Sequence, residues 1–344
     1  MSNRDTQRTR RRRGASQPTL KEVAEAAGVS AITASRALNT PERVNEATRA
    51  RILEAMERVG YVPNLIAGSL ASARSRFIAV IVPSLENSVF IEVIRGLQVT
   101  FEARGYQILL GNTDYDLERE HQLVRTFLGW SCSALVTAGL RHSPACRTLL
   151  AHCDKPVMEV MELGDGLDLN VGLDHRESGR CMASHLLERG HRRSVFVGAC
   201  LDRDYRAQMR YEGHREVFES AGHEAPLLEL DQLGSLDAGA GGLDRVLAEY
   251  RDADAIHFAN DDLAAGALLH SVRLGLTVPD DIAIAGFNGL PLGQHLTPRL
   301  TTIRSPREAM GRQAAEQVLR RLDDRRVSRR RLDVGFELLI GQST

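Results

Sequence analysis

The chain has 344 residues, of which 43% are hydrophobic and 26% are charged, and its formal net charge is −1 at pH 7. This length exceeds one ordinary domain and predicts two or three. No apolar run approaches the ~20 residues that span a membrane, and the polar N-terminus lacks the apolar core of a secretory signal. We therefore expect a cytoplasmic protein with no membrane partner.

The charge is unevenly distributed along the chain. Residues 1–76 contain 14 Lys and Arg against 7 Asp and Glu, a net of +7, so the remainder carries −8. A basic head on an acidic body predicts that only the head meets a polyanion. The five cysteines include no C-x-x-C pair. This argues against a disulfide framework or a zinc site, and we expect no metal and no cofactor.

Residues 1–17 come first in chain order and are rich in arginine, without apolar periodicity. This composition predicts a disordered basic arm. Two roles remain open for it. It is either a solubilising tail or a segment that contacts nucleic-acid phosphates, with an affinity that falls as salt rises.

Residues 18–63 predict a small helical domain that reads DNA. Thr19 and Glu22 have the spacing of a capping box at the start of a short helix, which Gly28 ends. Ser30 can then cap a second helix. Two short helices joined by a turn that contains glycine are typical of the helix-turn-helix, whose second helix enters the major groove.

A third helix is predicted over residues 45–59, where it closes a three-helix core. The apolar residues at helical spacing are Val44, Ile52, Leu53, Met56 and Val59. Residues 64–76 then form a short segment with no charge before Arg74. This segment is either a buried core helix or a hinge helix and linker, in which the helix folds when two copies meet on DNA.

From residue 77 onward, apolar strands alternate with helices. Strands that are apolar on both faces predict parallel sheets covered by helices on each side. The pattern restarts around residues 170–174, so we expect two doubly wound subdomains with a cleft at the C-terminal edges of their sheets. The predicted strands are 77–82, 106–110, 134–137, 156–161, 194–198, 227–230, 255–259 and 282–287.

Two sequence motifs in the head and hinge resemble a known signature. They read Val29-Ser30-x-x-Thr33-x-Ser35-Arg36-x-Leu38-Asn39 and Gly60-Tyr61-Val62-Pro63-Asn64-x-x-Ala67-x-Ser69-Leu70. In this order and spacing they are similar to the signature of the LacI family of bacterial repressors. The likeness continues nearly to the C-terminus and implies a periplasmic-binding-protein-like fold for residues 77–344. It implies a first subdomain of about 77–174 and 304–330 and a second of about 175–303 and 331–344.

The resemblance also implies which residues contact operator DNA. Ala31 and Ile32 would be the main specificity pair; both are apolar, so they favour a thymine methyl group and cannot hydrogen-bond a base edge. Ile32 could instead pack inside the helical core. Leu70 would wedge between base steps in the minor groove. The full set implied is Thr19, Ser30, Ala31, Ile32, Thr33, Ser35, Arg36, Asn39, Tyr61, Asn64, Ala67 and Leu70.

The same resemblance implies an effector site in the cleft. An arginine among carboxylates and amides suits a polyhydroxy acid, because its fork grips a carboxylate while Asp and Asn accept hydroxyls. Structural alternatives stay open, namely a loop and helix cap for residues 83–90, helix capping by one of the three polar groups at Asn260–Asp262, and a surface salt bridge for Arg210. The implied effector contacts are Ser84, Asn87, Phe90, Asp174, Arg210, Asp261 and Asn288.

Residues 278–287 and 298–300 narrow the resemblance to the gluconate-operon repressors and their 2-ketogluconate relatives. This makes gluconate the leading effector, ahead of 2-ketogluconate or another sugar or purine, acting as inducer or as corepressor. Residues 339–344 carry no heptad tail like that of the tetrameric lac repressor. We expect a homodimer on a pseudo-palindromic operator.

Two other functions find little support. The glycine-rich stretch Gly239–Gly242 is placed in a polar segment before a helix predicted over 243–250, which makes a poor dinucleotide site, and no G-x-S-x-G or H-E-x-x-H motif occurs. We therefore expect no enzymatic activity. The DNA-reading head and the polar N-terminus argue against a solute-binding protein of transport.

Overall fold

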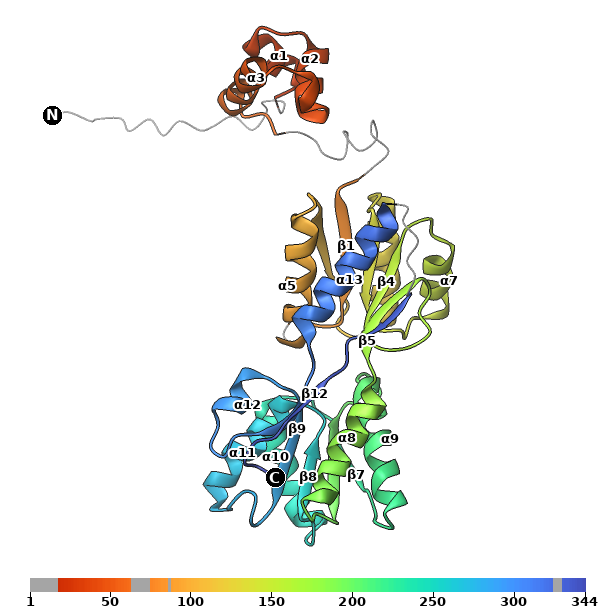
Figure 1. Cartoon of the computed structure of the whole chain (residues 1–344), viewed down its shortest axis with the longest axis vertical. Coiled ribbons are helices and arrows are strands. Elements are labelled where there is room, and N and C mark those ends of the chain that lie inside the picture. Colours follow the sequence, from red (N-terminus) through yellow and green to blue (C-terminus); the bar gives the residue numbers. More distant parts are fainter. Residues whose placement is uncertain (1–17, 63–74, 86–87, 324–329) are drawn as a thin grey trace, which may run out of the picture. The chain divides into compact units, whose positions relative to one another are not determined.

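The computed structural model describes residues 18–62, 75–85, 88–323 and 330–344. The chain divides after Ser75 into two compact units (Figure 1). The expected arm at 1–17 lies outside the described residues, as do residues 64–74 of the hinge helix and linker expected over 64–76. No helix in the described ranges is long and apolar enough to cross a membrane.

The first unit is a three-helix domain. Its elements are α1 Leu20–Ala27, α2 Ala31–Asn39, a 3₁₀ turn at Pro41–Arg43 and α3 Glu46–Val59. The predicted capping box is present, since Glu22 accepts from the Thr19 backbone N–H at 2.6 Å and Thr19 accepts from that of Glu22 at 3.4 Å. Gly28 ends α1 with φ of 65°, a left-handed conformation that glycine adopts without steric cost.

The core of this unit differs from the prediction at Leu53, and Val59 is half-buried and lies outside the core cluster. Ile52, Ala55 and Met56 face inward, at the i, i+3, i+4 spacing of one helical face. Leu53, which we expected in the core, is 44% exposed. One residue along a helix is a turn of about 100°. Leu53 therefore points away from the face that Ile52 defines.

The second unit contains two six-stranded sheets. The first has the order β11-β5-β4-β3-β1-β2 and the second the order β12-β10-β9-β8-β6-β7. All pairings are parallel except that of β12 with β10. The first sheet is made of β1 Phe77–Val82, β2 Gln107–Asn112, β3 Ala134–Ala138, β4 Val157–Glu162, β5 Leu169–Leu173 and β11 Arg331–Asp333. The second is made of β6 Ser194–Ala199, β7 Leu227–Leu230, β8 Ala255–Phe258, β9 Ala283–Asn288, β10 Thr301–Arg304 and β12 Glu337–Leu339.

Helices cover both faces of the first sheet. Alternate residues of β1 belong to different cores, because Ile78 and Val80 pack with α5 and α13 whereas Ala79 and Ile81 pack with α6 and α7. This alternation is the reason the strand is apolar throughout. The helices of the second unit are α5 Ser88–Glu102, α6 Leu117–Gly129, α7 Pro144–His152, α8 His175–Glu188, α9 Tyr205–Ser220, α10 Leu236–Glu249, α11 Asp261–Leu274, α12 Pro291–His295 and α13 Arg307–Leu322.

Glycines set the spacing of the closest helix pairs. A Cβ atom on Gly266 of α11 would lie 1.9 Å from the carbonyl oxygen of Leu236, and one on Gly239 of α10 would lie 2.0 Å from that of Leu263. The pairs α8–α9 and α5–α13 approach equally closely. Their contacts are Gly179 to the Arg210 oxygen, Gly213 to the Arg176 oxygen, Gly96 to the Glu308 oxygen and Gly311 to the Val93 oxygen. The expectation that Gly239–Gly242 precedes a helix was therefore wrong, because these residues lie inside α10.

Within the described residues, the chain passes between the two sheets at three places. They follow β5, β10 and β11. The last passage differs from our expectation, which assigned residues 331–344 to the second subdomain. Arg331–Asp333 pair in parallel with residues 170–172 of the first sheet, and the passage comes only between Asp333 and Glu337. A strand of three residues gives little periodic signal, and this explains the difference.

Candidate DNA-reading surface and effector pockets

The start of α2 presents the expected DNA-reading residues to solvent. Ile32 is 65% exposed, so packing inside the helical core does not explain it. Ala31 and Arg36 are also exposed. Ser30 caps the helix by accepting from the Thr33 backbone N–H at 3.2 Å, and the two hydroxyls lie 2.9 Å apart. The surface therefore combines apolar groups with hydroxyls and one long cation.

The remaining predicted DNA contacts are placed differently. Tyr61 is half-buried against the three-helix core, and Thr19 serves α1 as its cap. Ser35 is half-buried on α2. Asn64, Ala67 and Leu70 lie outside the described residues, as does the side chain of Asn39.

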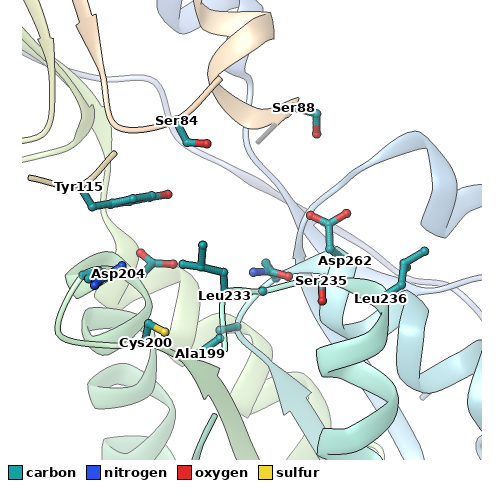
Figure 2. Close-up of a pocket in the computed structure, with 14 residues that line it drawn as sticks. Ser84, Ser88, Tyr115, Ala199, Cys200, Asp204, Leu233, Ser235, Leu236 and Asp262 are labelled. Carbon is teal, nitrogen blue, oxygen red and sulfur yellow. The ribbon is translucent and has the colours of Figure 1, made fainter. Parts of the chain in front are cut away.

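Two polar pockets lie at the C-terminal edges of the two sheets, where the sequence predicts a cleft. The larger, of about 360 Å³, we call the serine-lined pocket; its polar lining includes Ser84, Ser88, Asp204, Ser235, Asn260 and Asp262. Figure 2 shows Ser84 and Ser88 on one wall, with Asp204 and Asp262 opposite. The smaller, of about 260 Å³, we call the arginine-lined pocket; its polar lining includes Glu120, Arg141, Asp202 and Arg206. Tyr115 and Arg203 line both.

Of the two acidic residues at the start of α11, it is Asp262 that faces the serine-lined pocket. We predicted Asp261, but its side chain is buried in the subdomain, where it accepts from Thr302 Oγ1 and from the Leu290 backbone N–H, both at 2.6 Å. Burial raises the pKa of Asp261 to about 6 and also raises the pKa of Asp262. Asn260 both lines this pocket and caps α11, where its side chain accepts a hydrogen bond from the Leu263 backbone N–H at 3.0 Å.

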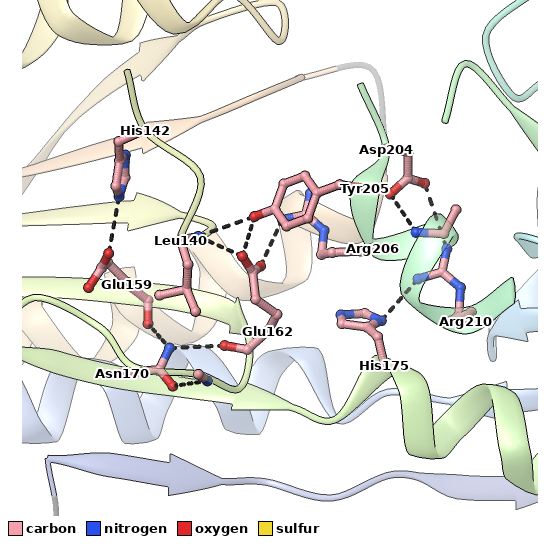
Figure 3. A network of polar contacts seen from close by, with 12 residues as sticks. Leu140, His142, Glu159, Glu162, Asn170, His175, Asp204, Tyr205, Arg206 and Arg210 are labelled. Atoms are coloured by element: carbon pink, nitrogen blue, oxygen red, sulfur yellow. Dashed lines mark hydrogen bonds and ion pairs between the residues drawn. The ribbon is translucent and has the colours of Figure 1, made fainter. Parts of the chain in front are cut away.

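Arg210 is paired with Asp204, which lines the serine-lined pocket, and Figure 3 shows its contacts with Asp204 and His175. Arg210 is 3% exposed and donates to the Ala259 carbonyl at 2.9 Å, and its guanidinium lies 3.6 Å from Asp204 and 4.1 Å above the ring centre of Phe287. Burial lowers the pKa of His175 well below its usual value, so the neutral ring can accept from Arg210 at 2.9 Å. Arg210 is thus neither a surface salt bridge nor a residue that lines either pocket. It holds Asp204 and Ala259, which do.

Three more predicted effector contacts line neither pocket. Phe90 is 2% exposed and belongs to the core beside β1. Asp174 caps α8, accepting from the Glu177 backbone N–H at 2.9 Å. Asn288 ends β9 with φ of 120° and its carbonyl accepts from Arg307. Asn87 lies outside the described residues, so of the six predicted contacts that the structure describes, Ser84 is the one that lines either of these two pockets.

Sequence reasoning missed a polar network that joins the two subdomains beside the arginine-lined pocket (Figure 3). Glu162, at the end of β4, accepts from the Leu140 backbone N–H at 2.6 Å, from Arg206 at 3.2 Å and from the Tyr205 hydroxyl. Burial raises the pKa of Tyr205, so its phenol keeps the proton that it donates. Glu162 comes from the first sheet and both other side chains from α9 of the second subdomain.

His142 contacts Glu120, one of the residues that line the arginine-lined pocket. Its ring nitrogens lie 2.9 Å from Glu120 Oε2 and 3.1 Å from Glu159 Oε1. Burial by itself lowers the pKa of His142, but hydrogen bonds to Cys146 and to the two glutamates outweigh it and raise that pKa to about 11. Glu120, His142 and Cys146 offer ligand atoms within 4.8 Å of one another. Both ring nitrogens of His142 already lie at hydrogen-bond distance from a glutamate, so the arrangement is explained as a charged hydrogen-bond network.

Comparisons with known proteins agree with this arrangement. The family described as bacterial regulatory proteins, lacI family, matches residues 19–64, and the periplasmic binding protein-like domain matches residues 183–344. The chain is 40% identical to the HTH-type transcriptional regulator GntR of Pseudomonas aeruginosa, over 98% of this chain and 99% of that protein. The chain belongs to the LacI family. It is also 38% identical to GntR of Escherichia coli K12, over 95% of this chain and 98% of the relative.

Solved structures of other LacI-family proteins share the fold. A LacI-family regulator from Silicibacter pomeroyi is 39% identical, with a TM-score of 0.89 over 95% of this chain and 99% of that one. The regulator GntR from Chromobacterium violaceum is also 39% identical, with a TM-score of 0.75 over 78% of this chain and 98% of that one. The predicted family and fold class are therefore confirmed, and this LacI-family chain is a transcriptional regulator that reads DNA.

Proposed function

We propose that this regulator represses an operon for the catabolism of a sugar acid, and that a gluconate-type acid bound in the cleft releases it from its operator. The likeness to the two GntR proteins and to the Escherichia coli regulator IdnR, which is 29% identical, supports this choice of effector class. The observation that supports it most strongly is the pair of polar pockets that share Arg203 and Tyr115 in their linings. They offer carboxylates and hydroxyls for a polyol and arginines for an acid group.

In this proposal the regulator acts in the cytoplasm as a homodimer on a pseudo-palindromic operator. Each subunit places the start of α2 in a major groove, with Ala31 and Ile32 against base edges and Arg36 against a base or phosphate. The effector lies between two subdomains that Glu162, Tyr205 and Arg206 already connect. Its binding can therefore change the position of one subdomain relative to the other. By linkage, the factor by which the effector weakens DNA binding is also the factor by which DNA weakens effector binding.

A titration on DNA tests the proposal. Purified protein and a labelled duplex from upstream of its own gene are mixed at several salt concentrations, and fluorescence anisotropy reports binding with and without gluconate or 2-ketogluconate. We expect tight binding that weakens with salt and weakens at least about tenfold with gluconate, an allosteric coupling of about 1.4 kcal/mol. Light scattering should give the mass of a dimer.

Other results would change the proposal in defined ways. Tighter binding with the acid would make it a corepressor, and a stronger response to 2-ketogluconate would make that acid the effector. Identical DNA affinity with both acids, while a neutral sugar or a purine releases the protein, would contradict a sugar-acid effector.

A further inference from the structure

We propose that the arginine-lined pocket is the carboxylate subsite of the effector cleft, with Arg141 and Arg203 binding the acid group while the polyol extends into the serine-lined pocket. This assignment rests on the proposed function and deepens it. It replaces Arg210, the arginine that the family resemblance implies, because Arg210 lines neither pocket and is already bonded to Ala259, His175 and Asp204.

The two pockets differ in the balance of arginines and carboxylates in their linings. Among its lining residues, the arginine-lined pocket has three arginines, Arg141, Arg203 and Arg206, against two carboxylates, Glu120 and Asp202. The serine-lined pocket shares Arg203 and has Asp204 and Asp262, of which Asp204 is paired with the buried Arg210. An elongated hydroxy acid that spans both pockets gains Coulomb energy when its carboxylate enters the first and its neutral hydroxyls enter the second.

The three arginines differ in their freedom to bind a ligand. Arg206 is 6% exposed and paired with Glu162 at 3.2 Å, so its charge is already neutralised. Arg141 uses Nη1 to donate to the Asp202 carbonyl at 2.7 Å, which leaves its other N–H groups for a ligand. Arg203 is exposed and has no ion pair with any described residue. Arg141 and Arg203 are therefore the available cations.

The acidic residues of this pocket leave room for an anion. Glu120 is hydrogen-bonded at 2.9 Å to the imidazolium of His142, which it shares with Glu159 at 3.1 Å, so its charge is compensated in part, and Asp202 opposes the free arginines. Arg141 follows β3 of the first subdomain and Arg203 follows β6 of the second. One carboxylate that binds both residues would thus hold the two subdomains together. The charge-assisted bonds that recognise the ligand would also close the cleft.

The cavity size agrees with a head group. At about 260 Å³ the arginine-lined pocket is smaller than the roughly 300–1,000 Å³ of sites that enclose a whole drug-sized ligand. The serine-lined pocket adds space of about 360 Å³. The assignment therefore predicts that the acid group dominates recognition, and that a neutral analogue of the same length and hydroxyl pattern binds poorly.

Calorimetry on the full-length protein tests this with gluconate and gluconamide, which differ in charge at one end only. We expect wild-type protein to prefer gluconate at least about tenfold, which corresponds to about 1.4 kcal/mol. Arg203→Met and Arg141→Met should each remove most of this preference by weakening gluconate and sparing gluconamide. The control Arg251→Met changes an exposed arginine that lines neither pocket and should keep the preference.

These measurements separate failure of the assignment from failure of the proposed function. If wild-type protein binds gluconate and both variants keep the full preference, while their thermal unfolding matches that of wild type, this assignment is overturned and the proposed function stands. If gluconamide binds wild-type protein as tightly as gluconate does, the carboxylate is not recognised at all, and the assignment is again overturned. If wild-type protein binds neither compound, the proposed function fails and takes the assignment with it.

Discussion

At the scale of single residues, the start of α11 shows two adjacent carboxylates with different tasks. Asp262 faces the serine-lined pocket, whereas Asp261 fastens α11 to β10 and to the segment after β9. The sequence predicted that this acidic stretch follows a strand and borders the cleft. It could not predict which carboxylate turns inward, because that depends on how α11 is rotated against β9 and β10. The same holds for Arg210, whose burial follows from its packing on Phe287.

The buried carboxylate of Asp261 should make stability depend on pH. Its folded pKa of about 6 lies above its usual value of 3.8, so the folded protein holds this proton more firmly than the unfolded chain does. The contribution of this group to stability is therefore greatest below pH 3.8 and falls as the pH rises through 6. The full loss is about 3 kcal/mol, at 1.36 kcal/mol per pKa unit.

Urea unfolding of wild type and Asp261→Asn at pH 4 and pH 7 measures this effect. The variant cannot titrate at this position, so wild type should lose stability relative to it between the two pH values. Asp237→Asn, at an exposed position on α10, is the control. A stability difference between wild type and Asp261→Asn that is the same at both pH values would contradict the prediction.

Ile32 should contribute to base recognition and not to folding, because its side chain is 65% exposed. Ile32→Ser should leave unfolding within about 0.5 kcal/mol of wild type, as surface changes usually do. It should also remove the preference for a thymine methyl group. Operators with single thymine-to-uracil changes lack that methyl. At one position of each half-site, the change should therefore reduce the affinity of wild type and leave the affinity of Ile32→Ser unchanged.

The core residue Ile52 provides the contrast for this experiment. Ile52 is fully buried, and Ile52→Ala should cost about 2–5 kcal/mol in unfolding. If Ile32→Ser instead destabilises the domain to a similar extent, or if wild type binds uracil-substituted operators as tightly as the original, the base-reading role is wrong.

At the scale of elements, two glycines at the contact between α10 and α11 set the positions of the N-termini of these helices, which border the cleft. Ser235 and Asn260 cap α10 and α11 and both line the serine-lined pocket. Their spacing depends on the contact of Gly239 and Gly266 with the facing backbone. Any side chain at either position must push the two helices apart, and with them the polar groups of the pocket.

Gly266→Ala tests this dependence. The added methyl would lie 1.9 Å from the Leu236 carbonyl oxygen, so we expect a loss of about 1–3 kcal/mol or more in stability, together with weaker gluconate binding. Gly241→Ala is the matched control, because a Cβ there meets nothing within 4 Å. It should stabilise α10 by up to about 1 kcal/mol. Thermal unfolding and calorimetry should separate the two variants, and equal behaviour would contradict the role of the contact.

The sequence predicted elements well where they are apolar throughout. Phe77–Val82 and Leu227–Leu230 begin and end at the predicted residues. The first half of α10 was missed because glycines depress helix propensity, and their value in packing appears only once α11 lies against them. The short strands β11 and β12 contain three residues each, too few for a period to emerge.

At the scale of the whole molecule, family and fold could be predicted from two motifs and an alternation of strands and helices. The pocket lining could not. Arg141 and Arg203 come from two connections and Glu120 from a helix, all far apart in sequence, and no local pattern marks any of them as belonging to a site. They meet because the parallel sheets bring the carboxyl ends of β2, β3 and β6, which these segments follow, to the cleft.

The three passages of the chain between the two sheets have a consequence for inheritance. Neither half of the sensing unit corresponds to an uninterrupted stretch of the gene, so one recombination event cannot transplant a half from a relative. A premature stop codon shortly before Arg331 would remove β11 from the first sheet and β12 from the second. New ligand preferences in this lineage should therefore arise mainly by point substitution in the loops that border the cleft, with the framework inherited as a whole.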